Sequence, residues 1–280
     1  MTLQQKIEQL FVEQKKKWEQ LNNILSGLDN VKNKSFEWGN DIKVNIEFNP
    51  DRIKSIVGNT EPGYTKIQKC RLCADNRPAP QEGIYYSDKY IILTNPYPVL
   101  RNHVTIPLHS HVPQLIGKKI SDMLSFAEQL PDYIVFYNGA KCGASIPEHF
   151  HFQAGLKQPV LMQGENELRT CLVIESESKE EIEERFEDVY YYLKSRQPNE
   201  DEPMMNLIAF TDNNKFTLHI FPRKAHRPKQ YYEQGSRQLL ISPGSLDMSG
   251  LITTARIEDF EKIQKEDIED MYLQVSLQVI

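Results

Sequence analysis

Two histidines and a glutamine at alternate positions, His149, His151 and Gln153, form the pattern in this chain that is best suited to chemistry. On a β-strand alternate side chains share one face, so these three would point together while Phe150 and Phe152 point into a core. A histidine held on such a surface can attack a phosphate and carry the transferred group covalently. The pattern therefore predicts nucleotidyl transfer through a histidine. A pair of metal ligands, or a surface position without a role, is the alternative.

A segment of small residues, Gly143-Ala144-Ser145, precedes these histidines. A turn of this kind brings backbone N–H groups close to an anion. Such donors, with a few local basic groups, are enough to bind a small phosphate-bearing ligand. The formal net charge of −6 therefore does not argue against a nucleotide.

The pair Cys70-x-x-Cys73 supplies two thiols at a spacing typical of metal sites. His109, His111 and His149 are the candidates to complete a tetrahedral Cys₂His₂ set, which zinc favours and which is structural when all four positions are protein ligands. A redox pair and two unrelated thiols are the alternatives. No βαβ pattern opens around Cys70, which disfavours the redox interpretation.

The composition is that of an ordinary soluble globular protein, with 39% hydrophobic and 26% charged residues. The chain has no net positive charge of the kind that favours nucleic-acid binding. There is no run of about 18 apolar residues, and the first residues lack the apolar core of a secretion signal. We therefore expect a cytoplasmic protein with neither a nucleic acid nor a membrane as partner. Its 280 residues allow one large domain or two moderate ones.

Hydrophobic periodicity predicts helices and strands in two similar groups. The N-terminal stripe from Leu3 to Leu25 predicts one helix over about 3–26, and alternation from Ile42 to Phe48 predicts a half-buried strand. The remaining helices are expected around 115–130, 182–193 and 257–274, and the remaining strands at about 90–94, 103–106, 133–137, 149–153, 171–174, 206–211, 215–221 and 238–242.

The second group repeats the first in outline. Each has a helix, a strand ending in Asn or Asp, and a strand that carries a histidine. Phe216 to Phe221, with His219, reads as a degraded counterpart of Glu148 to Gln153 that lacks the glutamine. The pattern predicts an α+β chain of two similar antiparallel-sheet halves, with the chemistry in the first half.

These motifs occur in the order seen in the galactose-1-phosphate uridylyltransferase branch of the histidine-triad superfamily. Within it the chain most resembles the GDP-L-galactose and GDP-D-glucose phosphorylases. The resemblance runs from about residue 40 to 270 and is most specific at the C-x-x-C and His-x-His-x-Gln elements. The other matching segments are Asn49-Pro-Asp-Arg52, Asn95-Pro-Tyr-Pro98, His103 to Pro107, His111 to Gln114, Asn138-Gly139, Asn206 to Pro222 and Asp247 to Gly250.

The resemblance implies two histidine-triad-like halves that form an intramolecular pseudo-dimer behind an N-terminal helix. It assigns 1–40 to that helix and a linker, 41–165 to the half with the site and the metal ligands, and 166–280 to a degenerate second half. It also implies zinc, replaceable by iron, on Cys70, Cys73, His149 and a histidine of the 109/111 region, where we prefer His111.

For catalysis, the resemblance implies that His151 takes the nucleotidyl group and that Gln153 hydrogen-bonds the transferred phosphate. Ser145 and the Gly143–Ala144 backbone would bind the departing phosphate side. Asn95 would lie near the ribose or base. Asn138, Lys141 and Arg223 are further candidates for substrate binding.

The chain is thus expected to be a nucleotidyltransferase, most simply one that splits a nucleoside diphosphate hexose with phosphate. Its partners would be a nucleotide sugar and inorganic phosphate or a sugar phosphate, and a homodimer stays open. A hexose-1-phosphate uridylyltransferase, a dinucleoside polyphosphate phosphorylase and a catalytically silent nucleotide-binding protein are the alternatives.

Overall fold

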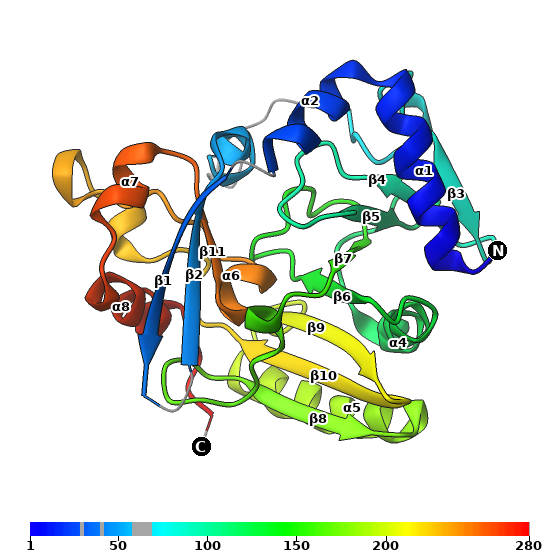
Figure 1. Cartoon of the computed structure of the whole chain (residues 1–280). Coiled ribbons are helices and arrows are strands. Elements are labelled where there is room, and N and C mark those ends of the chain that lie inside the picture. The colour runs from blue at the N-terminus through cyan, green and yellow to red at the C-terminus, as the bar shows by residue number, and fades with distance from the viewer. Residues whose placement is uncertain (29–30, 40–41, 58–68, 280) are drawn as a thin grey trace.

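The computed structural model describes residues 1–28, 31–39, 42–57 and 69–279 (Figure 1). Its centre is an eight-stranded sheet in the order β3-β4-β5-β7-β6-β9-β10-β8, in which every neighbouring pair is antiparallel. The strands are β3 (Gly83–Tyr86), β4 (Tyr90–Thr94), β5 (Val104–Pro107), β6 (Tyr133–Asn138), β7 (His151–Leu156), β8 (Leu172–Ser176), β9 (Met205–Asp212) and β10 (Lys215–Pro222).

The sheet contains the same unit twice. Strand β5, helix α4 (Ile120–Gln129), β6 and β7 follow one another, and β7 lies between β5 and β6. Strand β8, helix α5 (Lys179–Arg196), β9 and β10 repeat this order, with β10 between β8 and β9. The two units join through the antiparallel pair β6 and β9. The expected α+β fold with two similar halves is therefore confirmed; the exact boundaries at 41–165 and 166–280 stay predictions.

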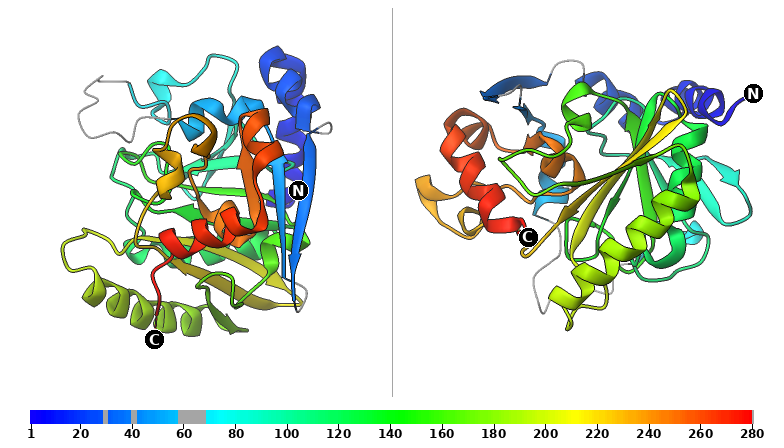
Figure 2. Two further views of the ribbon diagram at one scale, coloured as in Figure 1. Left: turned by 90° about the vertical axis from the view of Figure 1, so that its left-hand side faces the viewer. Right: turned by 90° about the horizontal axis from the view of Figure 1, so that it is seen from below.

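Helices cover one face of the sheet. These are α4 and α5 with the N-terminal pair α1 (Leu3–Lys17) and α2 (Glu19–Gly27). Inward residues such as Ile7, Phe126 and Phe186 share one core with Phe152 of the sheet. The figure viewed from below shows α5 lying along this face, with the C-terminal helices on the opposite side of the sheet (Figure 2).

A smaller three-stranded sheet covers the other face. It consists of β1 (Lys32–Trp38), β2 (Ile42–Phe48) and β11 (Leu251–Thr254), where β11 runs parallel to β2. Helices α6 (Ser245–Ser249), α7 (Ile257–Lys262) and α8 (Lys265–Val275) accompany it. Val44 and Ile46 of β2 share a second core with Phe136 and Ile208 of the large sheet. The small sheet and the C-terminal helices thus pack against both halves of the large sheet.

Local departures from the expected elements have packing causes. The helix expected over 3–26 breaks at Trp18, whose extended backbone (φ −129°, ψ 88°) sets α2 at a new angle while the indole stays buried. The helix expected over 257–274 breaks at Ile263. The strand expected at 238–242 is wrong: this buried segment has no strand partner, and β11 follows it instead.

The strand at the candidate site begins later than expected. Strand β7 starts at His151, and His149 lies in the turn before it, where its N–H donates to Ile146 O at 3.3 Å. The alternation of faces still holds from His151 onward, because Phe152 points into the helical core and Gln153 is only half-buried on the opposite face.

None of the helices within the described residues is long and apolar enough to cross a membrane.

The N-terminal helix contributes to the main core, and this can be tested on α1 itself. Ile7 is fully buried, whereas Val12 of the same helix is 48% exposed. Ile7→Ala should lower the free energy of unfolding by about 2–5 kcal/mol, because it leaves a cavity against the sheet. Val12→Ala should change it by less than about 0.5 kcal/mol. Urea denaturation measures both, and equal effects would show that α1 does not pack as described.

Candidate active site and metal cluster

The backbone of His151 has a neighbour on both sides and is hydrogen-bonded on one. On the edge toward β5, Pro107 is its register partner. On the edge toward β6, the carboxamide of Gln114 receives the His151 N–H on Oε1 at 2.8 Å and donates from Nε2 to His151 O at 2.9 Å. Gln114 is fully buried. The strand end that carries the imidazole is therefore fixed in position.

The ring of His151 is arranged as a neutral imidazole with one free nitrogen. Nδ1 lies 2.8 Å from His149 O, so Nδ1 carries the proton and donates it to that carbonyl. Burial lowers the pKa of His151 to about 4, so the ring is neutral at pH 7. Nε2 has no hydrogen-bond partner among the residues that the structure describes, and it is not one of the fully enclosed side-chain atoms. The residue as a whole is 3% exposed, so access to this nitrogen is narrow.

Gln153 is oriented by a second buried histidine. The Val99 N–H donates to His103 Nδ1 at 3.0 Å, so the proton of this ring is on Nε2. His103 Nε2 then donates to Gln153 Oε1 at 2.9 Å. Burial, followed by the Arg52 charge, lowers the pKa of His103 to about 3, which keeps it in this neutral form. The Gln153 oxygen is therefore occupied, and its NH₂ group is left to donate elsewhere.

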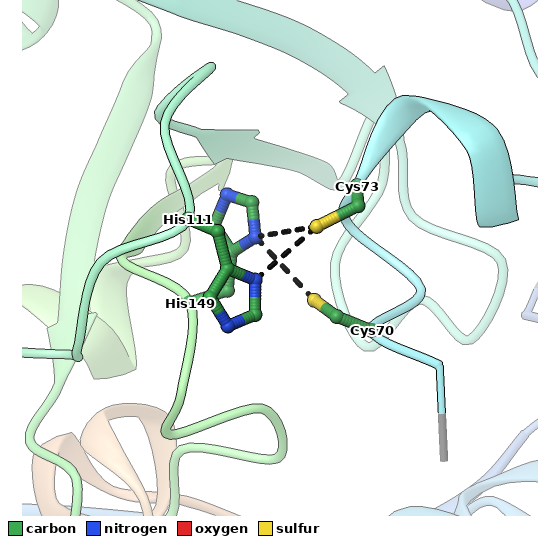
Figure 3. A group of neighbouring side chains, drawn as sticks. All are labelled: Cys70, Cys73, His111 and His149. Carbon is green, nitrogen blue, oxygen red and sulfur yellow. Dashed lines mark hydrogen bonds between the residues drawn. The ribbon is translucent and has the colours of Figure 1, made fainter. Parts of the chain in front are cut away.

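Four metal-ligating side chains meet beside this site. The ligand atoms of Cys70, Cys73, His111 and His149 all lie within 4.8 Å of one another (Figure 3). Cys73 Sγ is 3.2 Å from His111 Nδ1 and 3.6 Å from His149 Nδ1, and Cys70 Sγ is 3.4 Å from His149 Nδ1. Tetrahedral zinc, with bonds of about 2.0–2.3 Å to nitrogen and sulfur, places its ligand atoms about 3.3–3.8 Å apart. The donor set and spacing fit a metal ion.

Groups around the cluster hold the ligands in place. His149 Nε2 donates to Leu108 O at 2.8 Å, which turns its Nδ1 lone pair toward the sulfurs. The loop between the cysteines is closed by Cys73 N–H to Cys70 O at 3.2 Å. Arg77 donates from Nε and Nη2 to Leu72 O within the same loop. This arrangement favours a metal site over a redox pair, because both imidazoles face the thiols.

The structure also separates the two candidates for the third ligand. His111 faces Cys73, whereas His109 lies outside the cluster and stacks on Tyr85 with ring centroids 5.2 Å apart. The preference for His111 over His109 therefore agrees with the geometry. As a metal ligand His111 remains a prediction.

The loop 143–145 reaches the C-terminal segment. Gly143 has φ +95°, and a Cβ there would be 3.0 Å from Gly244 Cα, so only glycine fits. Ala144 is buried and Ser145 is exposed. The roles of these three residues in phosphate binding stay predictions.

Two predicted substrate contacts are occupied by protein groups. Asn138 is buried, and its Oδ1 accepts from Ser245 N, Ser245 Oγ and Asn206 Nδ2 at 2.6–2.9 Å. Arg223 is fully buried and donates to Asn206 Oδ1 and to four backbone carbonyls, those of Pro243, Ala225, His226 and Val275. In this arrangement Arg223 ties the second half to the C-terminal segment and leaves no donor for a ligand.

Lys141 and Asn95 also have internal partners. Lys141 is exposed and forms an ion pair with Glu200 at 2.6 Å. Asn95 is buried, its Oδ1 accepts from Tyr97 N at 2.8 Å, and its Nδ2 donates to Thr105 Oγ1 at 3.1 Å. Asn95 thus lies in the His103–Gln153 network, and a ribose contact for it stays a prediction.

The sequence did not single out two residues that the geometry makes important, His103 and Gln114. His103 opens a strand that pairs with β7, and this spacing could have indicated that it faces Gln153. Gln114 ends one of the matching segments, but its role could not be predicted because its contacts depend on the fold of a loop.

The comparisons with known proteins agree with this fold. The solved structure of yeast Ap4A phosphorylase Apa2 matches with a TM-score of 0.60 at 16% sequence identity, over 92% of this chain and 96% of that one. The same enzyme in complex with AMP gives 0.59 at 17%, and in complex with Ap4A 0.58 at 15%, with the same coverage. At such identities the likeness establishes the fold. A comparison with curated proteins gave no match.

The protein therefore has the two-sheet α+β fold that is seen in yeast Ap4A phosphorylase. It belongs to the family described as a domain of unknown function, DUF4922, whose model matches residues 10–156. The matched region contains the four-residue cluster, His151 and Gln153.

The cluster can be tested by metal content. Protein purified without added metal should carry about one equivalent of a transition metal, because two thiols and two imidazoles converge. His111→Ala should lose most of it and be less stable, whereas the neighbouring variant His109→Ala should retain it. Elemental analysis decides, and a His111→Ala protein with full metal content would contradict the ligand set.

Proposed function

We propose that this protein is a nucleotidyltransferase that acts through a covalent nucleotidyl-histidine on His151. The observation that carries the proposal is the free Nε2 of a neutral imidazole whose Nδ1 is held by His149 O at 2.8 Å. A neutral ring with a fixed tautomer is a competent nucleophile without a separate base.

The reaction would split a phosphoanhydride of a nucleotide. His151 Nε2 attacks the α-phosphorus, a P–N bond forms, and the P–O bond to the departing phosphate breaks. The imidazole becomes positively charged, and its Nδ1–H bond to His149 O stabilises that charge. An oxygen of inorganic phosphate or of a sugar phosphate then attacks the same phosphorus, and the P–N bond breaks. Two half-reactions through one site give ping-pong kinetics.

Gln153 would donate a hydrogen bond to the phosphate oxygens. Since His103 occupies its oxygen, the Gln153 NH₂ is directed to the substrate side and can donate to the charge that develops on the phosphate. The exposed Ser145 and the Gly143–Ala144 backbone would bind the departing group.

Zinc is the proposed metal, with iron as a replacement. Cys70, Cys73, His111 and His149 would hold it as a closed structural site. The ion would brace the turn that leads into β7, and the residues of this chain carry out the chemistry.

The proposal includes two classes of substrate, nucleoside diphosphate hexoses and dinucleoside polyphosphates. The motifs of the sequence favour a nucleoside diphosphate hexose split by phosphate. The fold shared with an Ap4A phosphorylase favours a dinucleoside polyphosphate. A panel of GDP-glucose, UDP-glucose and diadenosine tetraphosphate, assayed with and without phosphate, separates the two by the nucleotide released.

His151→Ala should lower turnover by about 10³-fold or more, because it removes the nucleophile. The control is the exposed His109→Ala, which should keep wild-type activity. With label on the α-phosphate, wild-type protein should form acid-labile label on histidine, and His151→Ala should not. Unchanged turnover in His151→Ala would refute the mechanism; bound nucleotide with no label in the wild type would indicate a silent binding protein.

Gln153→Glu should lower kcat by about 10²–10³-fold, since it replaces a positioned donor with a carboxylate that repels phosphate. His103 stays in place, so the protein should fold. Steady-state kinetics on the active substrate of the panel measure the effect. A loss below about threefold would remove Gln153 from the site.

A further inference from the structure

The pairing of β6 with β7 stops just before the candidate nucleophile. The ladder between these strands ends at Phe136↔Gln153. Continued in the same register, it would set Asn138 opposite His151, but no pair between β6 and β7 forms there. The carbonyl of Asn138 and the peptide groups of His151 therefore need other partners in a buried setting.

The side chain of Gln114 fills this gap. Its Oε1 accepts the His151 N–H, and its Nε2 donates both to His151 O at 2.9 Å and to Asn138 O at 3.0 Å. One carboxamide thus replaces the missing rung and uses both N–H groups and an oxygen. Only an amide has this set of donors and acceptor: a carboxylate has no hydrogens to give, and an apolar side chain has neither.

Gln114 itself is anchored at its backbone. Its N–H donates to Pro147 O at 2.9 Å, in the turn that precedes His149. The Tyr137 hydroxyl lies 3.1 Å from the Gln114 carbonyl and 2.6 Å from Glu202 Oε1, so these two acceptors share the single hydroxyl proton. These contacts fix the backbone of Gln114. Its carboxamide therefore stays in place and holds the backbone of His151 in one position.

We infer that Gln114 is a positioning residue that aims the imidazole of His151 by filling the gap between β6 and β7. The inference rests on the proposed nucleophilic role of His151. The ring direction depends on the 149–151 backbone, since Nδ1 bonds to the carbonyl of His149. The His149 side of this segment is fixed by its ring contacts with the cysteines and Leu108, and the His151 side by Gln114.

The experiment compares Gln114 with Gln163, two glutamines whose side-chain amides bond to backbone groups. Gln163 makes an equivalent contact with residues outside the candidate site, since Oε1 accepts from Lys43 N at 2.7 Å and Nε2 donates to Lys43 O and Val160 O. Gln114→Glu, of nearly the same shape, should lower kcat by about 10²-fold with KM changed less than about threefold, because the reacting atom is misplaced. Gln163→Glu should keep kcat and KM. Equal kcat values in the two variants would overturn the inference.

A milder variant covers the case in which Gln114→Glu does not fold. Tyr137→Phe removes the hydroxyl that contacts the Gln114 carbonyl and Glu202 Oε1, and leaves the Gln114 carboxamide itself intact. It should fold and lower kcat by about three- to tenfold. A folded Tyr137→Phe protein with unchanged kcat, alongside an unfolded Gln114→Glu, would leave Gln114 with a structural role alone and would also overturn the inference.

A readout independent of activity separates this inference from the proposed function. In ¹⁵N spectra of the wild-type protein, His151 should show a single tautomer with the proton on Nδ1, and its amide proton should exchange slowly. In Gln114→Glu or Tyr137→Phe, amide exchange should accelerate and the tautomers should mix, whether or not any substrate is turned over. Failure of the substrate panel with these spectral changes present would reject the proposed function alone; unchanged spectra would reject the role of Gln114.

Discussion

The hydrogen bond from His151 Nδ1 to the carbonyl of His149 is the interaction on which the candidate site depends. It fixes the tautomer, directs the lone pair of Nε2 away from the backbone, and couples the ring to the turn that holds the cluster. The side chain of His149 faces the cysteines, and the backbone carbonyl of His149 accepts the hydrogen bond from the His151 ring. A single residue thus connects the Cys/His cluster to the candidate nucleophile, so a shift of that turn would move both.

The covered face of the large sheet explains why so many polar residues near the site have internal partners. The small sheet and the C-terminal helices pack over the face that carries His151 and Gln153, and polar groups in such surroundings cost free energy unless they are hydrogen-bonded. Asn138 and Arg223 meet this demand with several bonds each. A polar side chain close to the histidine is therefore weak evidence of substrate binding. An imidazole nitrogen that has no partner in the described structure, on a ring whose other nitrogen is fixed by a carbonyl, is stronger evidence.

Local patterns predicted the parts of the structure that depend on nearby residues. The alternation at 42–48 and 133–137 marked strands that the structure contains, and the C-x-x-C pair marked half of the cluster. The site's supporting residues were not predictable in this way. Gln114 acts across two strands, and His103 and Asn95 converge on Gln153 from two others. The buried segment around Leu239–Ile241 looks like a strand in sequence, but hydrophobicity reports burial and does not reveal whether a neighbouring strand is available.

The repeated unit shows how the surroundings of the two histidines differ between the halves. His219 lies on β10, the counterpart of β7, and points to the same face of the sheet as His151. Its surroundings differ: its ring packs between Phe210 and Phe221, and its Nδ1 is buried with no partner among the described residues. A ring whose tautomer is not fixed by a carbonyl, and which has no oriented amide beside it, lacks what makes His151 a candidate nucleophile. The fold supplies a buried histidine in both halves, and the hydrogen bonds around His151 are what single it out as the candidate.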